Sequence, residues 1–216
     1  VVGVIGASMM KDAEVETDCF GFESTNESHH AVIHLDTEQS RCDADTLIRR
    51  SIERAMKSSE PEWFSSFSIP DLDPDKRRRA IELLVEDESK KRSGVFAVII
   101  DGVAALIDDP NDAESSFALV AQLQSLAIAY DCVVITVLHE NPNSETGKTR
   151  GHLGSQLERK AETNLRLWQD KEGVTTIYTA KSRHCYIPKK EGPCFKWNDD
   201  LQIHVSCGTE QARKEQ

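Results

Sequence analysis

The sequence predicts an α/β fold, a mostly parallel sheet flanked by helices and followed by antiparallel C-terminal edge strands. Three runs rich in Val and Ile support it, since such runs between helical patterns are typical of buried parallel strands. They are AVIHLDTE (31–38), FAVIIDG (96–102) and CVVITVLHENP (132–142). Each run ends on polar residues, and ligands bind beyond the carboxyl ends of such strands. The sequence therefore indicates one site, at one edge of the sheet.

The first predicted strand is followed by a helix over residues 43–56, where apolar side chains recur at helical spacing. Asp43 or Asp45 is available as its N-cap. A short strand and a turn are expected at 62–72. The Asp-Pro pair at 73–74 then begins a helix that extends to residue 92.

The second predicted strand is followed by a long helix over residues 113–131, with an apolar face suited to packing on the sheet. Six side chains are expected to form that face: Phe117, Leu119, Val120, Leu123, Leu126 and Ile128. A helix or short helix is expected within 155–167, leading to an edge strand. The rest of the chain alternates like antiparallel strands, and its 216 residues suit a single domain over 1–216.

The composition narrows the class of protein. The net charge is −11, but the segment 145–196 holds more Lys and Arg than Asp and Glu, so a polyanion can bind there. No apolar stretch reaches the roughly 18 residues of a membrane span, which favours a cytoplasmic protein without a membrane partner. The six cysteines form no CxxC pair, which favours reduced, mostly buried thiols over a zinc ribbon or a disulfide scaffold.

Four polar residues at the strand ends are candidates for chemistry. Asp101 suits a Mg²⁺ ligand beside nucleotide phosphates, or equally a turn Asp before a glycine. Glu38, just after Asp36, can polarise a water that attacks a γ-phosphate, although a polar surface turn has the same pattern. His139 can sense a phosphate oxygen as a neutral donor, and the alternative is a structural histidine.

Two basic features lie in the C-terminal part. The glycine-rich segment 141–155 is expected to be a mobile basic loop in which Lys148 and Arg150 contact single-stranded DNA. Lys181 and Arg183 share one side of an alternating strand. They can reach a neighbouring subunit's nucleotide, or they guard a solvent-facing strand edge.

The order of these motifs resembles the RecA-like P-loop ATPases, specifically the ATPase domain of RepA- and DnaB-type hexameric replicative helicases. The resemblance spans nearly the whole chain and implies ATP and Mg²⁺ as cofactors. It assigns Glu38 as the catalytic glutamate, Asp101 as the Walker B aspartate and His139 as the sensor. Lys181 and Arg183 correspond to the lysine and arginine finger that act in trans, and Arg166 is a second finger candidate.

The sequence departs from this family because it contains no G-x-x-x-x-G-K-[ST] motif. The only Gly-Lys-Thr, at 147–149, follows the third predicted strand and is a decoy, since a P-loop needs a strand that feeds a glycine turn and a helix. Residues 1–10 resemble the helix that normally follows a P-loop. We therefore expect an N-terminally truncated ATPase, or alternatively a protein that has lost nucleotide binding.

These observations favour an ATP-dependent, ring-forming DNA helicase-like motor that hydrolyses ATP between subunits. The alternative is a catalytically silent DNA-binding or regulatory module of a mobile element. A Mg²⁺ nuclease built on Asp36, Glu38 and Asp101 is a third reading, disfavoured because no general base accompanies the carboxylates.

Overall fold

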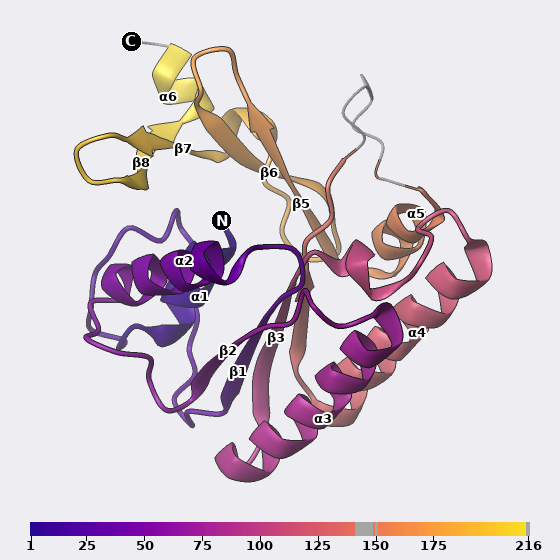
Figure 1. Ribbon diagram of the computed structural model, residues 1–216. Coiled ribbons are helices and arrows are strands. Elements are labelled where there is room, and N and C mark those ends of the chain that lie inside the picture. Colours follow the sequence, from indigo (N-terminus) through magenta and orange to yellow (C-terminus); the bar gives the residue numbers. More distant parts are fainter. Residues whose placement is uncertain (141–148, 150, 215–216) are drawn as a thin grey trace.

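The computed structural model describes residues 1–140, 149 and 151–214 (Figure 1). It contains a parallel sheet in the order β2-β1-β3-β4 and an antiparallel sheet in the order β5-β6-β7-β8. The parallel strands are β1 (Ala31–Asp36), β2 (Phe64–Ser68), β3 (Val95–Asp101) and β4 (Val133–Thr136). The antiparallel strands are β5 (Thr163–Gln169), β6 (Thr175–Ser182), β7 (Pro193–Asn198) and β8 (Ile203–Thr209).

Helices and two short 3₁₀ turns complete the described chain. They are α1 (Val2–Met10), α2 (Arg41–Arg54), α3 (Pro74–Arg92), η1 (Val103–Leu106), α4 (Ala113–Tyr130), α5 (Gly151–Lys160), η2 (Lys189–Glu191) and α6 (Glu210–Lys214). The predicted fold class is confirmed. No described helix has the length and apolar character needed to cross a membrane.

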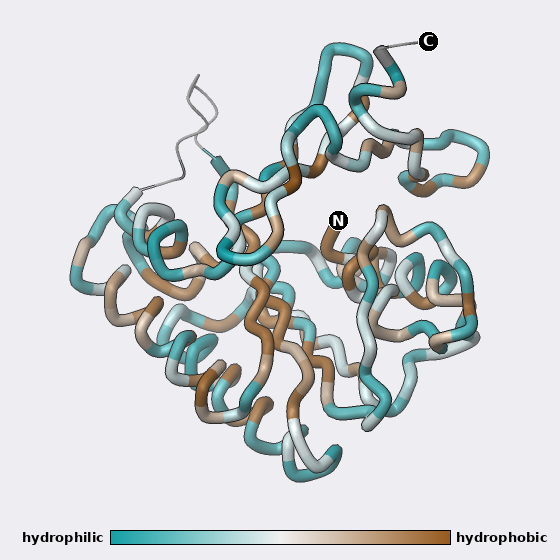
Figure 2. Tube along the Cα trace, turned by 180° about the vertical axis from the view of Figure 1, so that it is seen from behind, coloured by the Kyte–Doolittle hydropathy of each residue, from teal (hydrophilic) through white to brown (hydrophobic). Residues whose placement is uncertain are grey.

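The core lies on both faces of the parallel sheet, where hydrophobic residues concentrate (Figure 2). On one face, Ile33 and Leu35 of β1 pack with buried residues of α3 and α4. On the other face, Val32 packs with residues of α1 and α2 and with Ile177 and Phe195 of the antiparallel sheet. Burial on both faces explains why β1 and β3 are continuous apolar runs.

The N-caps agree only in part with the prediction. Asp73 caps α3 and accepts a hydrogen bond from the Lys76 amide at 2.9 Å, as expected. The cap of α2 is Ser40, whose hydroxyl accepts from the Asp43 amide at 3.2 Å, so the expected Asp43 or Asp45 cap is wrong. The helix begins two residues earlier than predicted, and Asp43 lies in its first turn.

The predicted apolar face of α4 is correct for four of its six residues. Leu119, Val120, Leu123 and Leu126 are buried. Phe117 and Ile128, however, are 55% and 74% exposed. At about 100° per residue, Phe117 lies roughly 200° around the helix from Leu119, on the solvent side.

The antiparallel C-terminal strands are present, but they form their own sheet instead of extending the parallel one. Phe195 of this sheet stacks on Phe20 with ring centroids 4.4 Å apart. Arg54 of α2 donates to the His204 carbonyl at 2.6 Å. Among the described residues, β4 and β5 each pair on one side only, so both sheets keep an open edge.

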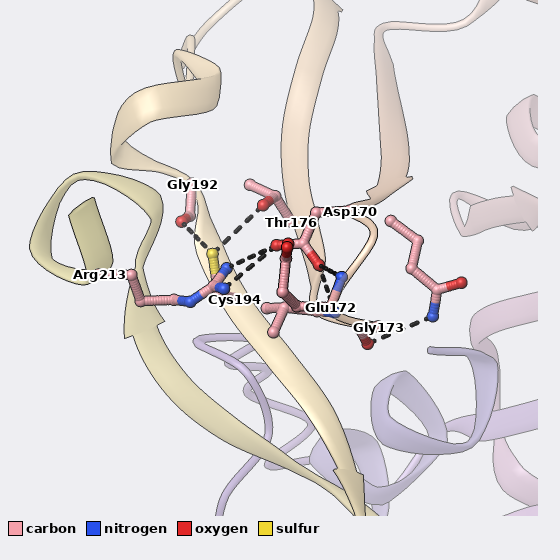
Figure 3. Close-up of polar contacts among 9 residues, drawn as sticks. Asp170, Glu172, Gly173, Thr176, Gly192, Cys194 and Arg213 are labelled. Carbon is pink, nitrogen blue, oxygen red and sulfur yellow. Dashed lines mark hydrogen bonds and ion pairs between the residues drawn. The ribbon is translucent and has the colours of Figure 1, made fainter.

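One end of the antiparallel sheet is fixed by polar contacts around Cys194 (Figure 3). Arg213 of α6 contacts one carboxylate oxygen of Asp170 through two guanidinium nitrogens, each at 3.1 Å. The Cys194 thiol lies 3.3 Å from the Thr176 hydroxyl. All six cysteines are free thiols, but only Cys19 and Cys194 are buried, so the expectation of mostly buried thiols is wrong.

A buried histidine gives the first testable prediction. His34 of β1 is 1% exposed, its Nδ1 lies 2.9 Å from the Ser66 hydroxyl, and burial lowers its pKa to about 4. Between about pH 4 and 6.5 the unfolded chain binds the proton that the folded chain excludes, so stability falls as the pH falls through this window. The full effect of a shift of this size is about 3 kcal/mol. Urea unfolding at about pH 4.5 and about pH 7 should show this loss, and His34→Gln should remove most of it. An unchanged pH dependence in the variant would contradict the assignment.

Candidate functional site

The carboxyl ends of β1 and β3 are joined by the residues that follow the apolar runs. Asp36 and Asp101 are register partners in the parallel pair. The Thr37 amide donates to the Asp101 carbonyl at 3.1 Å, and its buried hydroxyl lies within 2.9 Å of the Asp101 carbonyl and 2.8 Å of the Gly102 carbonyl. The two strand ends are therefore held in one fixed arrangement.

Asp36 shapes the turn that presents Glu38. One carboxylate oxygen, Oδ1, accepts from the Glu38 amide at 3.0 Å and from the Gln39 amide at 2.9 Å. This is the local bonding typical of aspartate turns. The Glu38 side chain remains 41% exposed, at the edge of the sheet.

Gly102 is required by conformation and by space. Its φ of +95° lies in the left-handed region that glycine favours. A Cβ at this position would stand 2.5 Å from both the Glu38 Cγ and the Thr37 hydroxyl oxygen. The Asp-Gly pair thus serves as a turn, and at the same time it leaves Asp101 beside Glu38.

Asp101 lies in a crowd of negative charge. Burial raises the pKa of its carboxyl, and the neighbouring Asp36 and Glu38 carboxylates raise it further. The α-amino group of Val1 and the His139 side chain oppose this shift. Val1 precedes α1, so the N-terminus of α1 also lies close to Asp101.

His139 completes this edge. Its Nε2 lies 3.5 Å from the Glu38 Oε2, and its side chain is 77% exposed. The structure thus brings together the four residues that the sequence places at strand ends. Thr37 and Gln39, which fix the turn, were missed, because nothing in the local pattern identifies cross-strand contacts of this kind.

This arrangement is chemically suited to Mg²⁺ and phosphate. Carboxylate oxygens are the ligands that Mg²⁺ prefers, and it usually keeps several waters or phosphate oxygens. No group of three or more His, Cys, Asp or Glu in the described chain could hold a metal by itself. Asp101 and Asp36 would hold the ion together with outside oxygens, and the amide groups at the start of α1 suit an anion.

The proposed DNA contacts cannot be placed, since Lys148 and Arg150 lie outside the described residues. The ends of the surrounding loop are described. Glu140 and Thr149 form an antiparallel bridge, and the Thr149 hydroxyl donates to the Glu158 carboxylate at 3.0 Å. Helix α5 begins at Gly151, right after the Gly-Lys-Thr-Arg run, but β4 ends at Thr136, so no strand feeds it in the manner of a P-loop.

Lys181 and Arg183 have different surroundings. The Lys181 ammonium donates to the carbonyls of Glu158, Arg159 and Ala161, at 2.8, 2.9 and 3.1 Å. It thereby binds the carbonyl groups at the C-terminal end of α5. Arg183 follows the last residue of β6, and its amide donates to the Glu162 carbonyl at 3.1 Å.

The second finger candidate, Arg166, lies in an ion-pair network. Its Nε contacts Glu140 at 3.1 Å and its Nη2 contacts Glu158 at 3.5 Å. Arg166 therefore links β5 to the base of the loop and to α5. The sequence did not indicate Glu140 or Glu158, because both contacts depend on the tertiary fold.

No protein-family model matches the sequence, and no curated protein matches it. Solved structures do match. The ATPase domain of a DnaB-like helicase superposes with a TM-score of 0.55 and 14% sequence identity, covering 82% of this chain and 74% of that one. At this identity the similarity concerns the fold. The fold is RecA-like, as the motif order predicted.

The Lys181 contacts give a second prediction. Replacing Lys181 with Met should lower the free energy of unfolding by about 1–3 kcal/mol, because the carbonyls at the end of α5 lose a charged donor. Chemical denaturation measures the change. Lys171→Met, at an exposed turn position, is the matched control and should change stability by less than about 0.5 kcal/mol. Equal stability of the two variants would contradict the capping role.

Proposed function

We propose that this chain is the greater part of an ATP-hydrolysing motor domain acting on single-stranded DNA, of the RecA-like helicase type. One observation carries the proposal: Asp36, Glu38, Asp101 and His139 converge at the carboxyl edge of a parallel sheet, beside the N-terminus of α1. In open α/β sheets this edge is where ligands bind.

Each residue has a definite role in this proposal. Glu38 orients and deprotonates the attacking water, and its partial exposure leaves room for that water. Asp101 faces the Mg²⁺ that neutralises the phosphate oxygens. His139, 3.5 Å from Glu38, senses the terminal phosphate and transmits its loss to the chain that follows.

The phosphates need a glycine turn that this sequence does not contain. We propose that a strand lying along the open edge of β4 supplies it and passes by that turn into α1. Two features support this placement. The described part of β4 pairs only with β3, and its Val133 side chain is 55% exposed. The start of α1 already lies near Asp101, where the turn would deliver its amides.

We further propose that subunits assemble into a ring and that Arg183 reaches the nucleotide of a neighbour. Lys181 was the companion candidate. Its three hydrogen bonds to α5 favour a positioning role, in which it fixes the end of β6 and so directs Arg183. Lys148 and Arg150 would contact the DNA phosphates.

A second candidate function is a catalytically silent DNA-binding or regulatory module of a mobile element. The lack of a G-x-x-x-x-G-K-[ST] motif in this sequence favours it. An intact protein that binds single-stranded DNA but neither binds nor hydrolyses ATP would establish the module and exclude the motor.

The motor proposal predicts that the intact protein hydrolyses ATP faster with single-stranded DNA. Glu38→Gln should reduce this rate by about 10²–10⁴-fold, because an amide cannot accept the proton of the attacking water. Phosphate release measures the rate. Glu53→Gln, on the exposed side of α2, is the matched control and should retain full activity. A Glu38→Gln variant as active as the control would exclude the assigned base.

A further inference from the structure

Asp36 has no role in the proposed reaction, yet it is the most enclosed carboxylate at the site. It is 1% exposed. Its Oδ1 accepts two backbone amides, while its buried Oδ2 has no hydrogen-bond partner among the described residues. Buried polar atoms in folded proteins nearly always have a partner, because leaving one unpaired costs free energy. A turn residue requires only Oδ1, so the turn does not account for Oδ2.

The neighbours of Asp36 add negative charge and little compensation. Asp101 is its partner in the strand pairing, and Glu38 lies two residues further along. Gln39 places an amide nitrogen 3.4 Å from the Asp101 Oδ2. The positive groups that act on Asp101 are the α-amino group of Val1 and His139. Two carboxylates side by side at a strand edge thus lack a strong counter-charge from the described side chains.

We propose that Asp36 and Asp101 together form a divalent cation site, with the Oδ2 of Asp36 as its second carboxylate oxygen. The inference builds on the proposed function, in which Asp101 alone faces Mg²⁺. Two carboxylates leave most positions of an octahedral ion to water and phosphate oxygens, which suits Mg²⁺. Asp36 then has two tasks: Oδ1 holds the turn that carries Glu38, and Oδ2 holds the ion that Glu38 acts beside.

The first test uses the protein without nucleotide, so that it is independent of ATP hydrolysis. Mn²⁺, as a paramagnetic substitute for Mg²⁺, should broaden the backbone amide NMR signals of residues 36–39 and 101–102 before others, and excess Mg²⁺ should reverse the effect. Broadening confined to other acidic segments, such as 108–114, would overturn the inference. This test requires no variant.

The second test uses Asp36→Asn, which keeps an oxygen to accept the two amides but removes the charge. In EDTA the variant should have a Tm about 2–4 °C above that of the wild type, since the repulsion with Asp101 is relieved. Millimolar Mn²⁺ should raise the Tm of the wild type but not that of the variant, whose Mn²⁺ affinity should fall at least about tenfold. Asp45→Asn, on exposed α2, is the matched control and should behave as wild type.

A purely structural role for Asp36 gives the opposite pattern. The variant would then be no more stable than the wild type in EDTA, and Mn²⁺ would act equally on both proteins, which would overturn the inference. Failure of the proposed function is distinguishable. A protein that shows the Mn²⁺ effects but no ATPase activity retains the cation site and loses the motor, whereas an active ATPase without these effects retains the motor and loses this site.

Discussion

The in-register pairing of β1 with β3 is the constraint on which the site depends. It makes Asp36 and Asp101 neighbours, and the contacts of Thr37 with the Asp101 and Gly102 carbonyls fix the two strand ends. A slip of one residue would turn the apolar side chains of β1 to the opposite face. Because α1 and α2 pack on one face and α3 and α4 on the other, the two-sided core holds this register and thereby positions the acids.

The same pairing creates an electrostatic cost. Three carboxylates gather at one edge, and the pKa of Asp101 is raised by burial and by the other two. Such concentrations of unfavourable charge are typical of functional sites, where a ligand supplies what the fold lacks. The C-terminal sheet has the opposite character, because Lys181 and Arg166 there are already engaged by carbonyl and carboxylate groups. We therefore infer that the acidic edge is built for ligand chemistry and that the cations near α5 mainly fix geometry.

The sequence was sufficient for the elements whose signals are local. The apolar runs before Asp36 and Asp101 predicted β1 and β3, and Asp73 with the following proline predicted the start of α3. It was insufficient where two local choices were equivalent or where contacts are long-range. Ser40 and Asp43 are both good caps, so only the helix phase decides between them. The contacts of Lys181 with α5 join residues about 20 positions apart, and no local pattern reveals them.

The central claim is that nucleotide phosphates and a divalent ion bind at the edge formed by β1 and β3. The most direct measurement is a structure of the intact protein with a non-hydrolysable ATP analogue and Mg²⁺. The account predicts the terminal phosphate between the N-terminus of α1 and Glu38, with the ion beside Asp101. A nucleotide bound away from this edge, or a well-ordered protein without nucleotide at saturating concentration, would contradict it.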